Sequence, residues 1–207
     1  MTRQRDRSAT EAALLAAGQG ILMSQGWQGL SVQAVAEGAR CDRKLVYRYF
    51  GGLDGVIDAL MDEALSRFGT ALDAAPALDD GADFAAFMRA SLPAYARALI
   101  AVPEIALLHG WALADGSGAA SLRLARANEA VQEWLRARRP RLRTPPGGDV
   151  LALNALLTGA IHHLAIHAAL RVPLAGLSID AASLPRIEAA LDQALASFAA
   201  APERSAA

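Results

Sequence analysis

The segment that most constrains the fold is LSVQAVAEGARCDRKLVYRYFGGLDGV, residues 30–56. Val32, Val35 and Ala36 recur in it at the i, i+3 and i+4 spacing of one buried helical face. Ser31 precedes them and can cap the helix, because its hydroxyl can accept a hydrogen bond from a backbone N–H group left unpaired in the first turn. The pattern predicts a short helix that begins after Ser31.

A second short helix is predicted after a tight turn. Asp42 can cap it, and a negative charge suits the positive end of the helix dipole. Leu45, Val46 and Phe50 form its apolar edge. Two such helices, with basic residues on the outer face of the second, have the layout of a helix-turn-helix whose second helix enters the DNA major groove. The residues left for solvent or a ligand are Arg43, Lys44, Tyr47, Arg48 and Tyr49.

This arrangement resembles the tetracycline-repressor (TetR) family of bacterial transcriptional regulators. The resemblance implies a three-helix DNA-binding head, a long fourth helix and a helical body that binds a small effector and dimerises. It extends over roughly residues 8–60, about a quarter of the chain. The matching positions are Gly26-Trp27, Ser31, Val35-Ala36, residues 39–42 and residues 46–50.

Several positions depart from the family pattern. Arg40 stands where the family usually has a turn glycine, and a φ above 0° would cost arginine about 1 kcal/mol. Leu53 stands where a lysine commonly contacts a phosphate. Gly51, Gly52 and Gly55 crowd the same junction, which predicts a loose start to the fourth helix. These departures bear on DNA affinity more than on fold.

Composition favours an all-α protein. The chain has 207 residues, of which 54% are apolar and only 5% aromatic. Alanine, a strong helix former, supplies much of the apolar content, and Ala-Leu runs follow helical spacing. We expect an N-terminal three-helix head with a helix-turn-helix DNA-binding domain at residues 1–52. A larger helical ligand-binding and dimerisation domain is expected at residues 53–207.

Charge is concentrated at the amino end. Residues 1–50 hold seven Arg and Lys against four Asp and Glu, a net charge of +3, while the whole chain carries −1. Residues 51–207 therefore carry −4. A basic head on an acidic body is typical of a DNA-binding protein, although a chance asymmetry of the surface has the same appearance.

The predicted DNA contacts follow from side-chain chemistry. Cationic side chains can neutralise phosphates or donate to guanine edges, and arginine has the better bidentate geometry. Tyrosine hydroxyls and the capped start of a helix can contact phosphates, although either tyrosine could instead be a core or interface aromatic. The candidate DNA-binding residues are Ser31, Arg40, Arg43, Lys44, Tyr47, Arg48 and Tyr49.

Helices are also predicted along the rest of the chain. Residues 1–7 are expected to form a flexible basic arm, and Pro93 to kink the helix that contains it. The segment RRPRLRTPPGGD is either a solvated linker or a second nucleic-acid patch, with arginines at positions 136, 138, 139, 141 and 143. The predicted helices span about 8–25, 53–72, 83–100, 103–113, 119–139, 149–171 and 183–200.

The last two predicted helices are the candidate dimer interface. The helix at 149–171 is apolar on more than one face, so it needs two partners, its own core and a second subunit. The helix at 183–200 has one apolar stripe that includes Leu191, Leu195 and Phe198. We expect a homodimer in which two recognition helices read a palindromic operator, with a monomer that buries both helices as the alternative.

A ligand cavity is expected in the body. An apolar or aromatic effector bound there would shift the fourth helix and release a repressor from its operator. His163 and His167 lie four residues apart on one helical face, but no Cys or Glu stands obviously near to complete a metal site. The candidate lining residues are Met61, Phe68, Phe87, Met88, Ser91, Tyr95, His109, Trp111, Trp134 and His163.

Other function classes are less well supported by the sequence. No nucleophile–base–acid group, phosphate loop or metal set is evident, so we expect neither an enzyme nor a cofactor. The single cysteine, Cys41, allows no internal disulfide and is expected to pack as a structural thiol. The N-terminus lacks a signal peptide and no bilayer-spanning run is apparent, so a cytoplasmic location is expected. The alternative function is a small-molecule-binding or scaffolding helical dimer that has lost specific DNA binding.

Overall fold

The computed structural model describes residues 2–77, 83–115, 118–138 and 149–199, and the regular secondary structure within them is helical. An isolated antiparallel bridge joins Leu174 and Leu177 in the loop between α8 and α9. The expected all-α fold is therefore confirmed. Its elements are α1 (Thr2–Gln25), η1 (Trp27–Gly29), α2 (Val32–Gly38), α3 (Lys44–Phe50), α4 (Leu53–Asp73), α5 (Phe84–Ala101), α6 (Pro103–Ala114), α7 (Ala119–Arg138), α8 (Val150–Leu170) and α9 (Leu184–Ala199).

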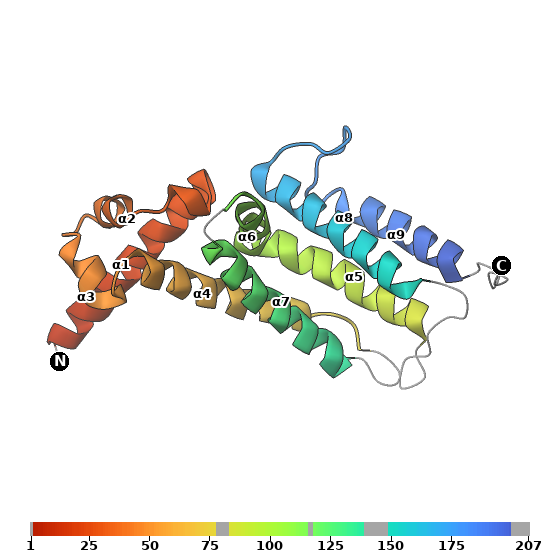
Figure 1. Ribbon diagram of the computed structural model, residues 1–207, viewed down its shortest axis with the longest axis horizontal. Coiled ribbons are helices and arrows are strands. Elements are labelled where there is room, and N and C mark those ends of the chain that lie inside the picture. The colour runs from red at the N-terminus through yellow and green to blue at the C-terminus, as the bar shows by residue number, and fades with distance from the viewer. Residues whose placement is uncertain (1, 78–82, 116–117, 139–148, 200–207) are drawn as a thin grey trace.

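The molecule is elongated, with α1, α2 and α3 gathered at one end (Figure 1). Helix α4 runs from this head into the body, where α5, α7, α8 and α9 lie roughly alongside one another (Figure 1). Helix α6 sits at the junction of the two parts and meets α5 at an angle of 88°. The fourth helix thus connects the head to the body, as the sequence predicts.

The first helix begins earlier than expected. Residues 2–7 continue α1 rather than forming a flexible arm, because no glycine or proline interrupts them and the Arg7 guanidinium pairs with Glu11 one turn later at 2.9 Å. At the other end, Gly26 has φ 75°, a left-handed conformation that stops the helix as predicted. Leu14 and Leu22 are the fully buried side chains of α1.

The turn between α2 and α3 has the geometry of a Schellman motif with arginine in place of glycine. The Cys41 N–H donates to the Ala36 carbonyl and the Arg40 N–H to the Glu37 carbonyl, each at 3.0 Å. Arg40 itself has φ 54°, so the expected strained position is present and the turn is not reshaped around it. Cys41 is half-buried and packs against the core of the head.

Both predicted caps of the helix-turn-helix form. The Ser31 hydroxyl accepts from the Ala34 N–H at 3.0 Å, and the Asp42 carboxylate accepts from the Lys44 N–H at 2.8 Å. Val46 is fully buried, while Leu45 and Phe50 pack partly buried against the same core. The amphipathic pattern of the sequence is therefore reproduced in the two short helices.

The junction between α3 and α4 is tight, and the expectation of a loose helix start is wrong. Gly51 and Gly52 have φ 75° and 142°, which side chains rarely adopt, and they reverse the chain within two residues. The Phe50 carbonyl occupies the space that a Cβ of Gly55 would need. These glycines allow the end of α3 to press onto the first turn of α4.

The body core follows the predicted stripes on α4 and α5. The expected inward residues of α4 are buried, and so are those of α5, including Phe87, Ser91 and Tyr95. The spacing of α7 predicts Leu122, Ala125, Val131, Trp134 and Leu135 on its inner face, and the last three do pack against the core. Leu122 and Ala125 face solvent instead, and Arg123 faces inward, where it pairs with two carboxylates of α4. The predicted linker arginines at 139, 141 and 143 lie outside the described residues.

Helix α8 leaves an apolar face uncovered. Leu151, Leu156 and Leu170 are exposed, and small residues between them are exposed too. By length and composition, Leu151–Leu170 is one helix among the described residues that could cross a bilayer. Only 11% of this segment is buried within the protein. This corrects the expectation that the sequence holds no such run. On α9, Leu195 is buried and Leu191 packs against the core, whereas the side chain of Phe198 is not among those described.

We predict that Arg40→Gly will raise the free energy of unfolding by about 1 kcal/mol, because glycine adopts φ 54° without steric cost. Arg40→Ala keeps the strain and removes the same side chain, so it should leave the stability nearly unchanged. Urea unfolding of the two variants beside the parent protein measures the difference. Equal stability of the glycine and alanine variants would show that the turn carries no strain.

Candidate functional site

The outer surface of α3 is basic and exposed. Arg43, Lys44 and Arg48 are exposed, and the Tyr47 side chain is 58% exposed, so its hydroxyl is accessible to a ligand. Among the described residues none of these cations forms an ion pair, and the same holds for Arg40 on the preceding turn. Arginines of the body are paired far more often, those in ion pairs being Arg67, Arg89, Arg97, Arg123 and Arg126.

Tyr49 lies differently from Tyr47. It is half-buried and packs against the core of the head. The guanidinium groups of Arg7 and Arg48 lie 5.5 and 5.8 Å from its ring centroid, within the range of a cation–π contact. Tyr49 therefore holds a basic pair in place beside α3, and Arg7 joins that surface although sequence reasoning assigned it to a flexible arm.

Ser31 stands at the N-terminus of α2, and its hydroxyl oxygen is already occupied by the capping bond. The hydroxyl proton is not used in that bond and can still be donated to an anion. Nearby, Gln33 donates to the Glu37 carboxylate at 2.8 Å along the exposed face of α2. The predicted DNA-binding residues thus lie on the two helices and the turn of one helix-turn-helix motif. Of its two tyrosines, Tyr49 is less exposed than Tyr47.

A buried carboxylate joins the head to the body. Glu104, in the first turn of α6, is 1% exposed. Its carboxylate accepts from the Gln19 amide of α1 and from the Arg67 guanidinium of α4, the latter at 2.6 Å. Its backbone carbonyl accepts from the Trp27 indole N–H at 3.1 Å. Trp27 also stacks on Trp111 of α6 with ring centroids 5.8 Å apart, so the head is held to α6 by several directed contacts.

A second link connects α7 to α4. Arg123 donates to Asp58 at 2.9 Å and to Asp54 at 3.0 Å, and Arg126 donates to Asp62 at 2.7 Å. The three aspartates are spaced four residues apart and therefore lie on one face of α4. A displacement of α7 along this row would pull on the end of α4 that adjoins α3.

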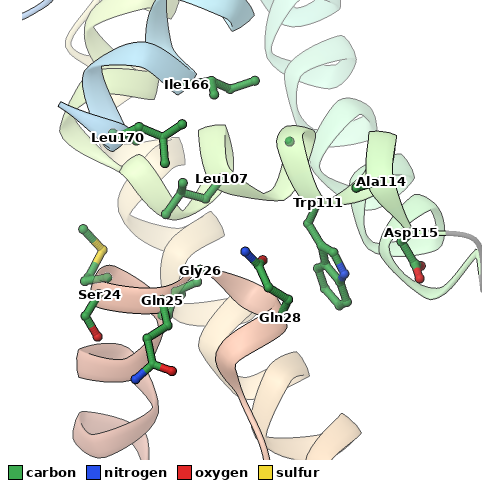
Figure 2. A pocket seen from close by; sticks show the side chains of 14 residues that line it. Ser24, Gln25, Gly26, Gln28, Leu107, Trp111, Ala114, Asp115, Ile166 and Leu170 are labelled. Carbon is green, nitrogen blue, oxygen red and sulfur yellow. The ribbon is translucent and has the colours of Figure 1, made fainter. Parts of the chain in front are cut away.

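An open groove of about 670 Å³ lies between the head and the body. The end of α1 and η1 form one side, and α6 with the end of α8 form the other. Figure 2 shows Gln28 reaching toward the groove from the head, with Leu107, Trp111 and Leu170 facing it from the body. Changes in head orientation would widen or narrow this groove.

A smaller cavity of about 190 Å³ lies within the body, lined by α5, α7 and α8. The predicted lining residues that border it are Phe87, Met88, Ser91, Tyr95 and Trp134. Asn154 and Thr158 of α8 border it as well. Sequence reasoning missed these two because their polar side chains, on an apolar helix, were not distinguished from surface positions.

The other predicted lining residues lie elsewhere. Met61 and Phe68 are buried in the core on α4, where the Phe68 ring meets Tyr95 edge to face at 6.1 Å. Trp111 borders the head–body groove instead of the cavity. His163 is exposed on the outer face of α8, because helical spacing turns it away from His162.

His109, His162 and Tyr95 form a polar cluster in the body, in which His109 and Tyr95 are buried and His162 is half-buried. Tyr95 also borders the cavity, whereas the predicted lining residue His109 does not. The Tyr95 hydroxyl and His162 Nε2 are hydrogen-bonded, and the two imidazole rings lie 3.9 Å apart. The Ile105 carbonyl accepts from His109 Nδ1 at 2.8 Å, which places the proton of the neutral ring on that nitrogen. Burial lowers the pKa of His109. The pKa of His162 is lowered to about 4, mainly by burial and to a smaller extent by the charge of the neighbouring His109. Burial also raises the pKa of Tyr95.

Histidines 163 and 167 contact each other at the surface, with ring centroids 4.7 Å apart. His167 Nδ1 lies 3.0 Å from the Val172 carbonyl. In the described part of the chain no group of three or more His, Cys, Asp or Glu side chains is arranged to hold a metal ion. Two imidazoles alone are fewer than the three or four protein ligands of a zinc site.

Comparison with known proteins identifies the fold. Solved structures similar to this chain include GusR of Salmonella enterica, with a TM-score of 0.60, 14% identity and coverage of 93% of this chain and 96% of that one. A protein of Rhodococcus sp. described as a TetR-family transcriptional regulator has a TM-score of 0.55, 19% identity and coverage of 93% and 100%. A TetR-family regulator of Marinobacter aquaeolei has a TM-score of 0.53, 17% identity and coverage of 93% and 97%. The chain has the TetR-family fold.

No model of a known protein family matches the sequence, and no curated protein matches it. The likeness to the TetR-fold structures thus rests on the path of the chain over nearly its whole length. In this chain, the helix-turn-helix consists of α2 and α3, and α3 carries the exposed basic residues. What that surface binds has to be argued from its own residues.

We predict that the stability of this TetR-fold protein will fall as the pH is lowered from about 6.5 to about 4. His162 has a pKa of about 4 when folded against an ordinary value of 6.5, so the unfolded chain binds more protons within that window. The loss attributable to His162 should be about 2 kcal/mol, which allows for the partial exposure of its ring.

His162→Gln should flatten this pH dependence, whereas His163→Gln, its exposed neighbour on α8, should leave it unchanged. Chemical unfolding at pH 7, 6, 5 and 4 measures the free energies. Parallel curves for the parent and the His162 variant would contradict the assignment of the buried titrating group.

Proposed function

We propose that the protein is a dimeric, ligand-responsive DNA-binding regulator, and that it acts as a repressor. The observation that carries the proposal is the surface of α3, where Arg43, Lys44 and Arg48 are exposed and make no ion pair with another described residue. Cations that face solvent unpaired can exchange their counterions for phosphates, which supplies most of the affinity for duplex DNA. A TetR-like fold holds that helix at one end of an elongated molecule, in a position to enter a groove.

Each side chain has a distinct role in this proposal. Arg43 and Lys44 stand at the N-terminus of α3, from which recognition helices contact base edges. Arg48 and the Tyr47 hydroxyl lie further along the helix and reach the phosphate backbone. Arg40, in the turn, can supply the phosphate contact that Leu53 lacks.

A homodimer through α8 and α9 follows from the uncovered face of α8. Leu151, Leu156 and Leu170 on that face would be exposed to water in a monomer, which disfavours the monomer. The exposed residues of α9 include the small Ala189, Ala190 and Ala194, so two copies can approach closely in a four-helix interface that includes α9. A twofold axis there would place two α3 helices on one palindromic operator.

The proposed response to ligand passes through the two ionic links. A molecule in the cavity touches α7, whose Arg123 is paired to Asp54 and Asp58 on α4. Helix α6 carries both the buried His109, whose ring lies against that of His162, and the Glu104 that binds the head. A ligand that favours one position of these helices would favour one spacing of the two heads, and so shift the population that can bind the operator.

We predict that the protein retains duplex DNA from the region upstream of its own coding sequence, with an affinity that falls steeply with salt. Arg48→Ala should weaken binding roughly tenfold or more and reduce the salt slope by about one. Fluorescence anisotropy at several salt concentrations measures both quantities.

The matched control is Arg171→Ala, which removes one exposed arginine from the loop after α8 and should leave DNA affinity nearly unchanged. An equal effect of the two variants would mean that binding is unspecific attraction to positive charge. Failure to retain any duplex at low salt would leave a small-molecule-binding helical dimer as the better description.

We predict that Leu156→Arg will dissociate the dimer, raising its dissociation constant by at least tenfold, because a charge would be buried at the interface without a partner. Leu122→Arg is the control, since Leu122 is 75% exposed on α7 and Leu156 is 72% exposed on α8. Sedimentation equilibrium distinguishes the two species. A dimer that survives Leu156→Arg but not Leu122→Arg would move the interface to α7.

A further inference from the structure

Two residues that border the cavity in the body carry buried side-chain polar atoms without a hydrogen-bond partner. The hydroxyl oxygen of Ser91 and the indole nitrogen of Trp134 are both buried, and neither forms a hydrogen bond with another described residue. Both residues border the cavity, Ser91 from α5 and Trp134 from α7. The Ser91 residue is only 2% exposed. Orphaned polar groups on two residues that border one small cavity point to a ligand whose binding would bring an acceptor within reach of both.

The physical cost of leaving these atoms unpaired makes them informative. More than nine in ten buried polar groups in proteins are hydrogen-bonded, and one left without a partner costs about 1–3 kcal/mol. The indole N–H is only a donor, so an acceptor atom is needed to satisfy it. The Ser91 hydroxyl can donate to such an acceptor as well. The missing partner is therefore an oxygen acceptor rather than a donor.

The charges around the cavity exclude one class of ligand. Arg136 is the charged residue that borders it, and no carboxylate does so among the described residues. A cation placed inside would be desolvated next to an arginine and would find no counter-ion. The amide of Asn154 and the hydroxyl of Thr158 provide further neutral polar groups on the α8 side.

The size and lining of the cavity set the rest of the ligand. Its volume is about 190 Å³, and an apolar protein cavity of about 150 Å³ is large enough for benzene. Phe84, Phe87, Tyr95 and Trp134 supply aromatic walls, against which a ring packs edge to face or offset. One substituted ring fills this space.

We propose that the cavity binds an uncharged aromatic molecule of about one ring that carries a carbonyl oxygen, and that Ser91 and Trp134 donate hydrogen bonds to that oxygen. The inference rests on the proposed function in one respect, since it makes this molecule the effector. It adds the chemical class of the effector and the side chains that select it. A hydrocarbon of the same shape fills the cavity but leaves both donors unsatisfied, and an ammonium compound of the same shape is rejected.

Three probes of nearly identical shape separate these cases: acetophenone, isopropylbenzene and 1-phenylethylammonium. They share a phenyl ring and a branched two-carbon side chain, and they differ in a carbonyl oxygen, a methyl group or an ammonium group. Binding to the full-length protein is measured by titration calorimetry. We expect acetophenone to bind at least tenfold more tightly than the ammonium compound.

The variants Ser91→Ala and Trp134→Phe test the donors directly. Each removes one donor and keeps most of the side chain, so each should weaken acetophenone about fivefold and leave isopropylbenzene nearly unchanged. The hydrocarbon is thus the control for any change in cavity shape. In the ¹H–¹⁵N spectrum, the Trp134 indole resonance, assigned by its loss in Trp134→Phe, should move downfield with acetophenone and much less with isopropylbenzene.

The proposal is overturned if both variants weaken the ketone and the hydrocarbon equally, if the ammonium compound binds as tightly as the ketone, or if the Trp134 resonance responds equally to ketone and hydrocarbon. DNA retention is measured separately on the same protein without any probe. A protein that retains no DNA but selects the ketone would contradict the regulator function and support the ligand class. A protein that retains DNA but does not select the ketone would support the regulator function and contradict the ligand class.

Discussion

The arrangement of head and body depends on one buried carboxylate. Glu104 receives hydrogen bonds from α1 and α4 at its side chain and from the Trp27 indole at its backbone, so three segments converge on the first turn of α6. A carboxylate with 1% exposure is tolerable only while such partners remain, because an unpaired buried charge is very costly. The orientation of the head is therefore set by directed polar contacts, which have a narrower range of geometry than an apolar interface.

Local rules made the head predictable from the sequence. The caps at Ser31 and Asp42, the helix stop at Gly26 and the left-handed position of Arg40 each follow from a few neighbouring residues, and all are present. The order of helices in the body was accessible for the same reason, since helical spacing and breakers are local signals. The tight α3–α4 junction was not predictable, because three glycines within five residues indicate flexibility unless the approach of the Phe50 carbonyl to Gly55 is known.

Long-range packing decided what the sequence could not. The inner face of the first half of α7 was mispredicted because Arg123 turns inward to meet carboxylates that lie more than sixty residues earlier. For the cavity, Phe87 and Trp134 were predictable as aromatic side chains of the body, whereas Trp111 could be assigned to the groove only once its stacking on Trp27 was seen. His162 was not among the predicted lining residues, and its bond to Tyr95 comes from a helix crossing that no sequence pattern records. The DNA-binding and effector roles of these residues remain predictions.

The absence of a side chain at Gly55 has a mechanical consequence. The carbonyl of Phe50 lies where a Cβ of residue 55 would be. The last turn of α3 therefore contacts the first turn of α4 backbone to backbone, with no side chain between them that could reorient. At this point α3 packs on α4 through backbone atoms, so α3 is expected to move with the long helix. A small tilt of α4 would then be carried to α3 and its exposed basic side chains.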